Sequence, residues 1–244
     1  MPRTAIDPST NRLISPEEFA ARHPDWRSNG LRPRCALCSA EVTPHAVHSP
    51  NMASSFHHPD GSTCLLSSTP DPRFSGLRPA EADLEQEAEL LAQLRKPEVV
   101  ERLYCACRAI CETLSCEEFL EMCAMAHQLH IWRYKGMTME LTAFVMATLA
   151  DLPKTDKRRK PMRVVLRKPK GHGPGDFFVK PETCELEKRF PQSGERYETR
   201  DRIRVLDTAY LPSRQDTAWM SEPLRRCVRR CHLTVSSSRP TVSS

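Results

Sequence analysis

The segment from Cys35 to Cys64 holds the residue types that bind borderline and soft metal ions. Cys35 and Cys38 form a C-x2-C pair, and His58 and Cys64 form an H-x5-C pair. Structural zinc takes four such ligands in a tetrahedron, usually as two pairs from two tight turns. The 19 residues between the pairs suffice for two short strands and a turn. The spacing therefore predicts one Zn²⁺ ion held by Cys35, Cys38, His58 and Cys64.

The fourth ligand has a neighbouring alternative, His57. Side chains alternate along an extended segment, so Phe56 and His58 share one side, which favours His58 as the ligand. Sequence alone nevertheless leaves His57 open. His45 and His48 have no partner at ligand spacing, and we expect both to be solvated.

The expected role of the metal is structural. A catalytic zinc needs an open coordination position and a general acid or base beside it. The four predicted ligands fill the tetrahedron, and the H-x-E … P-C-x-x-C pattern of the zinc deaminases is absent from the sequence. We therefore expect the ion to hold a fold rather than to activate water.

The run "C-x2-C … SFHHPDGSTC" resembles the N-terminal zinc-finger region of the CoiA competence-protein family and related bacterial proteins. The matching residues are Cys35, Cys38, Phe56, His58 and Cys64, and the resemblance is confined to this segment. It implies a bacterial protein in which the finger precedes a nuclease-like domain of restriction-endonuclease type.

Such a nuclease domain needs an acid and then a D/E-x-K motif to hold Mg²⁺ and position water. Asp176 is a candidate first acid, and "CELEKRF" supplies Glu185, Glu187 and Lys188. Leu186 stands two positions before Lys188, so the D/E-x-K register fails. A nuclease-related enzyme with a degenerate or displaced site at Asp176 and Glu187 remains an alternative.

Basic residues gather in the last part of the chain. Residues 151–244 hold 22 Lys and Arg against 12 Asp and Glu, whereas residues 81–150 hold 6 against 12. Basic loops and strand edges bind phosphate backbones through counterion release. The alternatives are an internal charge match with the acidic middle, or a solvated sheet edge. The candidates for contact with DNA or RNA are Lys157, Arg158, Arg159, Lys160, Arg163, Arg167 and Lys168.

The expected redox state follows from the expected compartment. The sequence shows no signal peptide, and its most apolar late stretch carries Glu140 and is too short to span a bilayer. We therefore expect a cytoplasmic protein without a membrane partner, whose 11 cysteines are reduced thiols rather than bridges. Five of them should pack as small hydrophobes in helices: Cys105, Cys107, Cys111, Cys116 and Cys123. A second metal site stays open among Cys184, Cys227, Cys231 and His232.

The elements that position these residues are predicted to run from helices to strands, which gives an α+β fold with a small zinc ribbon-like finger, a helical bundle segment and a small antiparallel sheet. The chain is expected to begin with an extended lead over 1–30, which contains a short helix capped by Ser15. The finger follows at 31–66, a linker at 67–78, an α+β domain at 79–232 and a disordered tail at 233–244. Within the α+β domain, helices are expected over 79–152 and the sheet over 160–212, including a strand at "DFFVK".

The predicted function is that of a non-enzymatic, zinc-stabilised bacterial binding protein that contacts nucleic acid through its basic C-terminal region. Two alternatives remain. One is the nuclease-related enzyme, and the other is a protein-interaction module whose acidic helices at 81–121 dock a partner protein.

Overall fold

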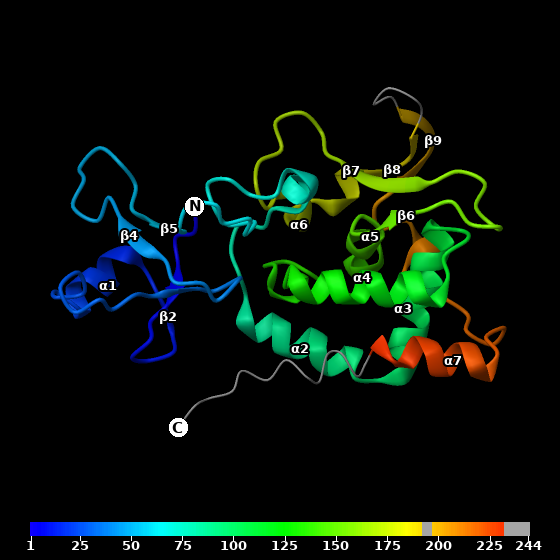
Figure 1. Ribbon diagram of the computed structural model, residues 1–244, viewed down its shortest axis with the longest axis horizontal. Helices are drawn as coiled ribbons and strands as arrows, with labels where there is room; N and C mark the ends of the chain where they lie inside the picture. Colours follow the sequence, from blue (N-terminus) through cyan, green and yellow to red (C-terminus); the bar gives the residue numbers. More distant parts are fainter. Residues whose placement is uncertain (192–196, 232–244) are drawn as a thin grey trace.

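The computed structural model describes residues 1–191 and 197–231 (Figure 1). An N-terminal part with short strands leads into a larger part of helices and a sheet, which is the α+β class predicted from the sequence. His232 and the predicted tail at 233–244 lie outside the described residues. Among the described residues, no helix is both long enough and apolar enough to cross a lipid bilayer.

The N-terminal part is built from two small sheets and one helix. Its elements are β1 (Ala5–Ile6), β2 (Leu13–Ile14), α1 (Pro16–Arg22), β3 (Arg34–Cys35), β4 (Thr43–His45) and β5 (Ser55–His57). β1 pairs antiparallel with both β2 and β3, and β4 pairs antiparallel with β5. Because β1 lies directly beside β3, the lead segment and the finger segment share one sheet.

Helix α1 starts where the sequence predicted. The Ser15 hydroxyl accepts a bond from the Glu18 N–H, and the Glu18 carboxylate accepts one from the Ser15 N–H, which completes a capping box. The buried carboxylate of Asp7 accepts bonds from Arg22 and His23 and ties the end of the helix to β1. Burial tends to raise the pKa of Asp7, but bonds from Ser9, Arg22 and His23 outweigh it and hold that pKa far below its usual range.

The helical part contains α2 (Leu84–Leu94), α3 (Pro97–Ile110), α4 (Cys116–Gln128) and α5 (Met139–Ala147). Polar side chains fix three of the starts: Asp83 accepts from the Gln86 N–H, Ser115 forms a capping box, and Thr138 accepts from the Leu141 N–H. Helix α5 is buried along most of its length, and α3 and α4 both pack against it. This helix therefore forms the centre of the core.

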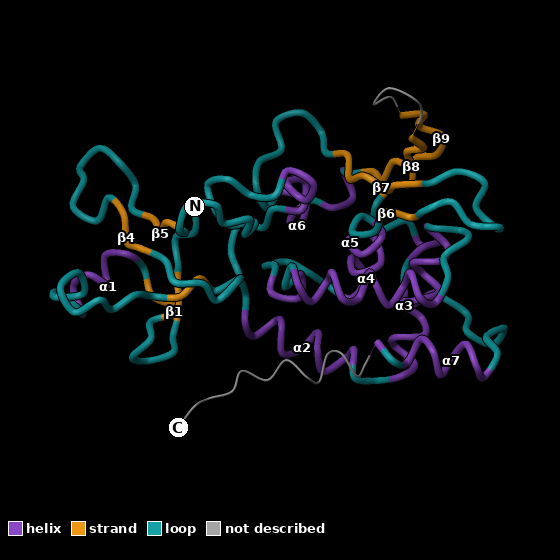
Figure 2. The backbone as a smooth tube through the Cα atoms, in the orientation of Figure 1, coloured by secondary structure: helices purple, strands orange, loops and turns teal. Residues whose placement is uncertain are grey.

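The sheet lies to one side of these helices (Figure 2). Its antiparallel order is β6 (Asp151–Leu152), β7 (Met162–Arg167), β8 (Glu185–Pro191) and β9 (Tyr197–Arg204). Val164, Leu186 and Ile203 form the buried inner face, as the period of two in these strands requires. The segment 67–78, expected as a linker, holds a 3-10 helix over Pro72–Leu77 that contacts β7.

The predicted strand at "DFFVK" is wrong, because this segment forms the short helix α6 (Asp176–Val179). Phe177 and Phe178 are both buried and meet edge to face with ring centroids 4.9 Å apart. Consecutive residues of a strand point to opposite faces, so a strand at a sheet surface would bury only one of them. A helical turn lets both rings enter the same core.

A helix that the sequence analysis did not predict, α7 (Glu222–Arg229), packs on α3 and α4. The carboxylate of Glu101 on α3 is buried and accepts bonds from Arg225 and Arg229 of α7. The pairing of two guanidinium groups with one buried carboxylate makes the position of α7 specific, since separating them would leave that charge buried and unpaired.

Two disulfide bonds also join α4 to α7. They link Cys116 to Cys227 and Cys123 to Cys231, with Cα–Cα distances of 6.4 and 6.2 Å. The expectation of free thiols is therefore wrong for these four residues. Cys35, Cys38, Cys64, Cys105, Cys107, Cys111 and Cys184 are free cysteines.

Candidate functional site

The four predicted metal ligands come together in the structure. The ligand atoms of Cys35, Cys38, His58 and Cys64 all lie within 4.8 Å of one another. Cys35 ends β3 and Cys38 stands in the turn that follows, while His58 comes directly after β5. The turn is closed by the Cys35 N–H, which donates to the carbonyl of Ala40 at 2.7 Å. This group could hold a metal ion.

The protonation equilibria of the group reflect its crowding. Contacts with Cys35 and then Cys64 lower the pKa of Cys38, whereas contacts with Cys35 and Cys38 raise the pKa of Cys64. Burial tends to lower the pKa of His58, but contacts with Cys35 and Cys38 outweigh it and raise that pKa to about 9. A thiolate in this group of side chains therefore requires a positively charged partner beside it.

The choice between the two adjacent histidines is resolved by their side chains. The His58 Nε2 atom lies 3.5 Å from the Cys38 Sγ atom. His57 instead stacks on His45, with ring centroids 4.1 Å apart, and does not belong to the group. His45 and His48 are exposed, as the sequence analysis expected.

Arg133, which follows α4, docks this group onto the helices. Its guanidinium donates to the carbonyl of Leu37 at 3.1 Å, inside the turn that carries two of the ligands. The same guanidinium donates to Glu87 on α2 at 2.8 Å. The geometry of the turn from Cys35 to Cys38 is thus coupled to the helical part through one side chain.

The second candidate surface is the outer face of the sheet, which points away from its buried inner residues. Strand register places Arg163 opposite Arg189, and Arg202 opposite Glu187. We call the five arginines of this face the arginine face: Arg163, Arg167, Arg189, Arg202 and Arg204.

One carboxylate lies at the centre of the arginine face. Glu187 is only 5% exposed and accepts bonds from Arg167 at 2.8 Å and from Arg189 at 2.9 Å. Arg202 lies 3.4 Å from the same carboxylate. Burial tends to raise the pKa of Glu187, but Arg189 and Arg167 outweigh it and lower that pKa, so the carboxylate is ionised.

The seven residues predicted to contact nucleic acid divide into three groups. Arg163 and Arg167 stand on the arginine face. Lys157, Arg159 and Lys160 are exposed in the loop before β7, and half-buried Lys168 follows β7. The prediction is wrong for Arg158, which is 5% exposed and lies inside the protein.

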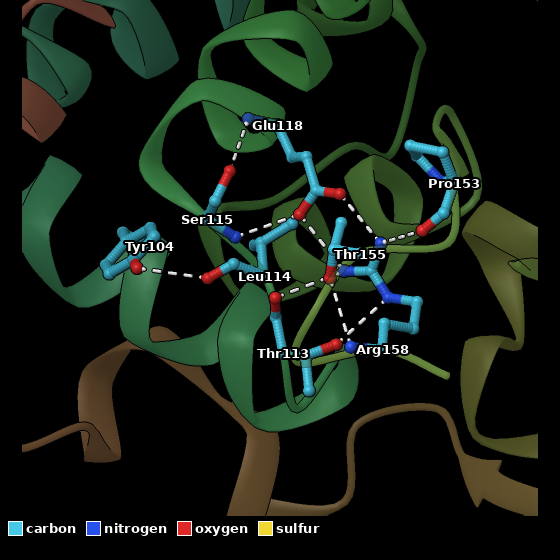
Figure 3. Close-up of polar contacts among 8 residues, drawn as sticks. All are labelled: Tyr104, Thr113, Leu114, Ser115, Glu118, Pro153, Thr155 and Arg158. Carbon is cyan, nitrogen blue, oxygen red and sulfur yellow. Dashed lines mark hydrogen bonds and ion pairs between the residues drawn. The ribbon is translucent and has the colours of Figure 1, made fainter. Parts of the chain in front are cut away.

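Arg158 is buried because its guanidinium has a complete set of acceptors (Figure 3). It donates to both carboxylate oxygens of Glu118, at 2.7 and 3.0 Å. It also donates to the hydroxyl and carbonyl of Thr113 and to the carbonyl of Pro153. A phosphate would have to displace all of these partners, so Arg158 is an anchor for its loop rather than a ligand.

Sequence reasoning missed Arg189, Arg202 and Arg204. The available signal was their spacing, since Arg202 and Arg204 are two residues apart in a segment expected to be a strand and so share a face. Placing Arg189 beside them requires the register between β8 and β9, which the sequence does not supply.

The acids of the alternative nuclease site do not form a metal site. Asp176 accepts a bond from the Gly173 N–H at 2.6 Å, and Glu187 is occupied by arginines. Within residues 1–191 and 197–231, the group around Cys35 is the only cluster of three or more His, Cys, Asp or Glu residues that could hold a metal ion.

The possible second metal site is also corrected. Cys227 and Cys231 are consumed in disulfide bonds, and buried Cys184 lies beside Thr183. His232 falls outside the part of the chain that the structure describes. Cys227 and Cys231, two of these candidate ligands, instead join α7 to α4.

Comparisons of the chain with protein-family models, with curated proteins and with solved structures found no match. The resemblance of the finger segment to the CoiA family therefore stays a prediction. Function is inferred below from the chemistry of the two candidate sites.

Proposed function

We propose that this chain is a non-enzymatic, zinc-stabilised protein that binds nucleic acid through the arginine face. The observation that carries the proposal is a set of five arginines on the outer face of the sheet, three of which share the buried carboxylate of Glu187. The finger contributes a metal-stabilised N-terminal part and no reaction chemistry.

Zinc is the metal that best suits the donor set. Three thiolates and one imidazole are soft and borderline ligands, and they are typical of closed tetrahedral zinc sites. Such a site has no open coordination position for a substrate or an activated water. The inferred role of the ion is therefore to fix the turns of the finger.

The charge balance of the arginine face favours an anionic polymer. Glu187 supplies one negative charge to Arg167, Arg189 and Arg202. Asp151 pairs with Arg163, and Glu185 lies opposite Arg204, so the five arginines still keep an excess of positive charge. Guanidinium groups bind phosphate in a bidentate manner, and a row of them follows a phosphate backbone well. Contacts of this type position a nucleic acid without reading its bases, so we expect low sequence specificity.

The test is binding of the purified protein to labelled single- and double-stranded DNA and RNA across a salt series. The variant replaces Arg163, Arg202 and Arg204 by Gln, which leaves Arg167 and Arg189 to neutralise Glu187 and so protects the fold. Each phosphate contact contributes about 0.9 to the slope of log K against log salt for duplex DNA. We expect the variant to reduce this slope by about 2 to 3.

A matched control removes the same charge elsewhere, through Arg12→Gln, Arg102→Gln and Arg214→Gln at exposed positions. The proposal fails if the control lowers the slope as much as the test variant does. It also fails if the wild-type protein binds no nucleic acid at low salt.

A further inference from the structure

A hollow of about 410 Å³ lies at the edge of the sheet, lined by the loop 157–160, by strand residues Lys188, Phe190 and Asp201, and by Glu112. Lys188 and buried Leu186 are two residues apart in β8, so their side chains lie on the same, inner face of the sheet. Lys188 therefore points away from the arginine face. The hollow is therefore a second basic site rather than a part of that face.

The floor of the hollow carries a nearly buried ammonium group. The side chain of Lys188 is 7% exposed, and its Nζ atom lies 3.0 Å from Glu112 and 3.6 Å from Asp201. Those two carboxylates are 76% and 57% exposed. A buried charge needs a partner, but partners that remain in water can rotate away at little cost. The counter-ion of Lys188 is thus exchangeable.

The rim of the hollow is held in place by the anchor described above. Arg158 is fixed by Glu118, Thr113 and Pro153 (Figure 3), so the residues on either side of it cannot move far. Lys157, Arg159 and Lys160 are exposed and line the hollow. Lys160 also lies 3.7 Å from Glu198, a weak contact that a stronger anion can replace.

We propose that this hollow binds a phosphate monoester, as found at the end of a nucleic-acid strand. Lys188 contacts the phosphate in place of the Glu112 carboxylate, and Lys157, Arg159 and Lys160 surround it. Phe190 and Met162 supply an apolar wall for the adjoining nucleoside. A monoester carries more negative charge than an internal phosphodiester, which suits a site with four cations against two carboxylates. The strand-end assignment rests on the proposed function, because the strand is the one that the arginine face holds.

The experiment compares one single-stranded oligonucleotide with a 5′-phosphate and with a 5′-hydroxyl, and titrates a nucleoside 5′-monophosphate separately. We expect the phosphorylated strand to bind about tenfold more tightly, as for one added charge-assisted contact. Lys188→Met should remove the difference. Glu112→Gln should increase the affinity for the monophosphate several-fold, because it removes the competing carboxylate. Lys180→Met, at an exposed position outside the hollow, is the control.

Lys188→Met could fail to fold, so Lys157→Gln with Arg159→Gln at the exposed rim provides a second variant and should also reduce the preference. Equal binding of the two strands by the wild-type protein, with no binding of the monophosphate, overturns the inference and leaves the proposed function standing. Binding of the monophosphate in a Lys188-dependent manner without binding of any oligonucleotide supports the hollow as a monoester site and overturns the nucleic-acid function.

Discussion

Cysteines come together in two regions of this molecule, and the two arrangements differ in kind. In the N-terminal part, the ligands from Cys35 to Cys64 form one group around a space that a metal ion could fill. In the C-terminal part, α7 is joined to α4 by bridges between residues 111 and 108 positions apart. The first arrangement uses residues close together in the sequence, so their spacing can be recognised there. The second depends on the tertiary fold, and no spacing in the sequence reveals which cysteines pair.

This difference implies that the two ends should respond to different reagents. A chelator acts on the thiolate group, and a reductant acts on the disulfide bonds. If the two regions are stabilised independently, a chelator should leave α7 packed on α4, and a reductant should leave a metal bound to the N-terminal group. The two regions, and the Arg158 anchor between them in sequence, can each be perturbed separately, and the expected effects decrease in the order given.

The largest effect is expected from Cys38→Ser. Structural zinc sites contribute on the order of 10 kcal/mol to folding, so this variant should lose the metal and the ordered structure of residues 1–66. Metal content and amide hydrogen exchange measure the two losses. His48→Ala, at an exposed residue outside the group, should retain one metal per chain. A Cys38→Ser protein that still binds stoichiometric zinc contradicts the ligand assignment.

The disulfide bonds should give the next largest effect. A bridge that closes a loop of about 100 residues contributes up to roughly 4 to 5 kcal/mol by the chain-entropy model. Urea unfolding with and without a phosphine reductant should therefore show a decrease in the free energy of unfolding. A variant with Ser at all four bridged cysteines should be insensitive to the reductant. If wild type is equally insensitive, the bridges are absent in solution.

Arg158→Met should destabilise the protein by about 3 to 5 kcal/mol, because it leaves the Glu118 carboxylate buried without its partner. Arg159→Met, one residue further on at an exposed position, should change the stability by less than about 0.5 kcal/mol. Equal losses of stability in the two variants, measured by thermal or urea unfolding, would show that the contacts of Arg158 are not formed.

The same pair makes a pH prediction. Burial tends to raise the pKa of Glu118, but the bonds from Arg158 outweigh it and hold that pKa below the ordinary value of 4.5. A carboxyl group with a lowered folded pKa stabilises the protein above its unfolded pKa, and this contribution is lost as the pH falls through the folded value. The stability gap between wild type and Arg158→Met should therefore shrink as the pH falls below about 4.5, where Glu118 becomes protonated.

The smallest effect is expected from Arg133→Ala, which removes a hydrogen-bonded contact between the Cys35–Cys38 turn and the helices. We expect a loss of about 1 to 3 kcal/mol. Lys135→Ala breaks a neighbouring exposed ion pair with Glu81 and should cost less than about 1 kcal/mol. Amide exchange of Leu37 and Ser39 should accelerate in the first variant only. Unchanged amide exchange rates in Arg133→Ala would show that Arg133 does not couple the stability of the finger to that of the helices.

Features that depend on near neighbours in sequence were predictable. The cap at Ser15 and the ligand pairs were found because each uses residues a few positions apart. The basic run around Arg158 looked uniform, because the burial of one member depends on Glu118, 40 positions away. Likewise, α7 was not predicted because it buries few apolar residues. Its contact with Glu101 is an ion pair between residues far apart in the sequence.

The position of α7 has a consequence for the order of folding. This helix packs on α3 and α4 but is translated long after them, since the whole sheet lies between them in the chain. During synthesis, Glu101 and the α4 cysteines face no partner until α7 leaves the ribosome. Contacts of such large sequence separation slow folding and leave apolar surface exposed in the meantime. The helical core of this protein is therefore completed by one of the last described elements to emerge.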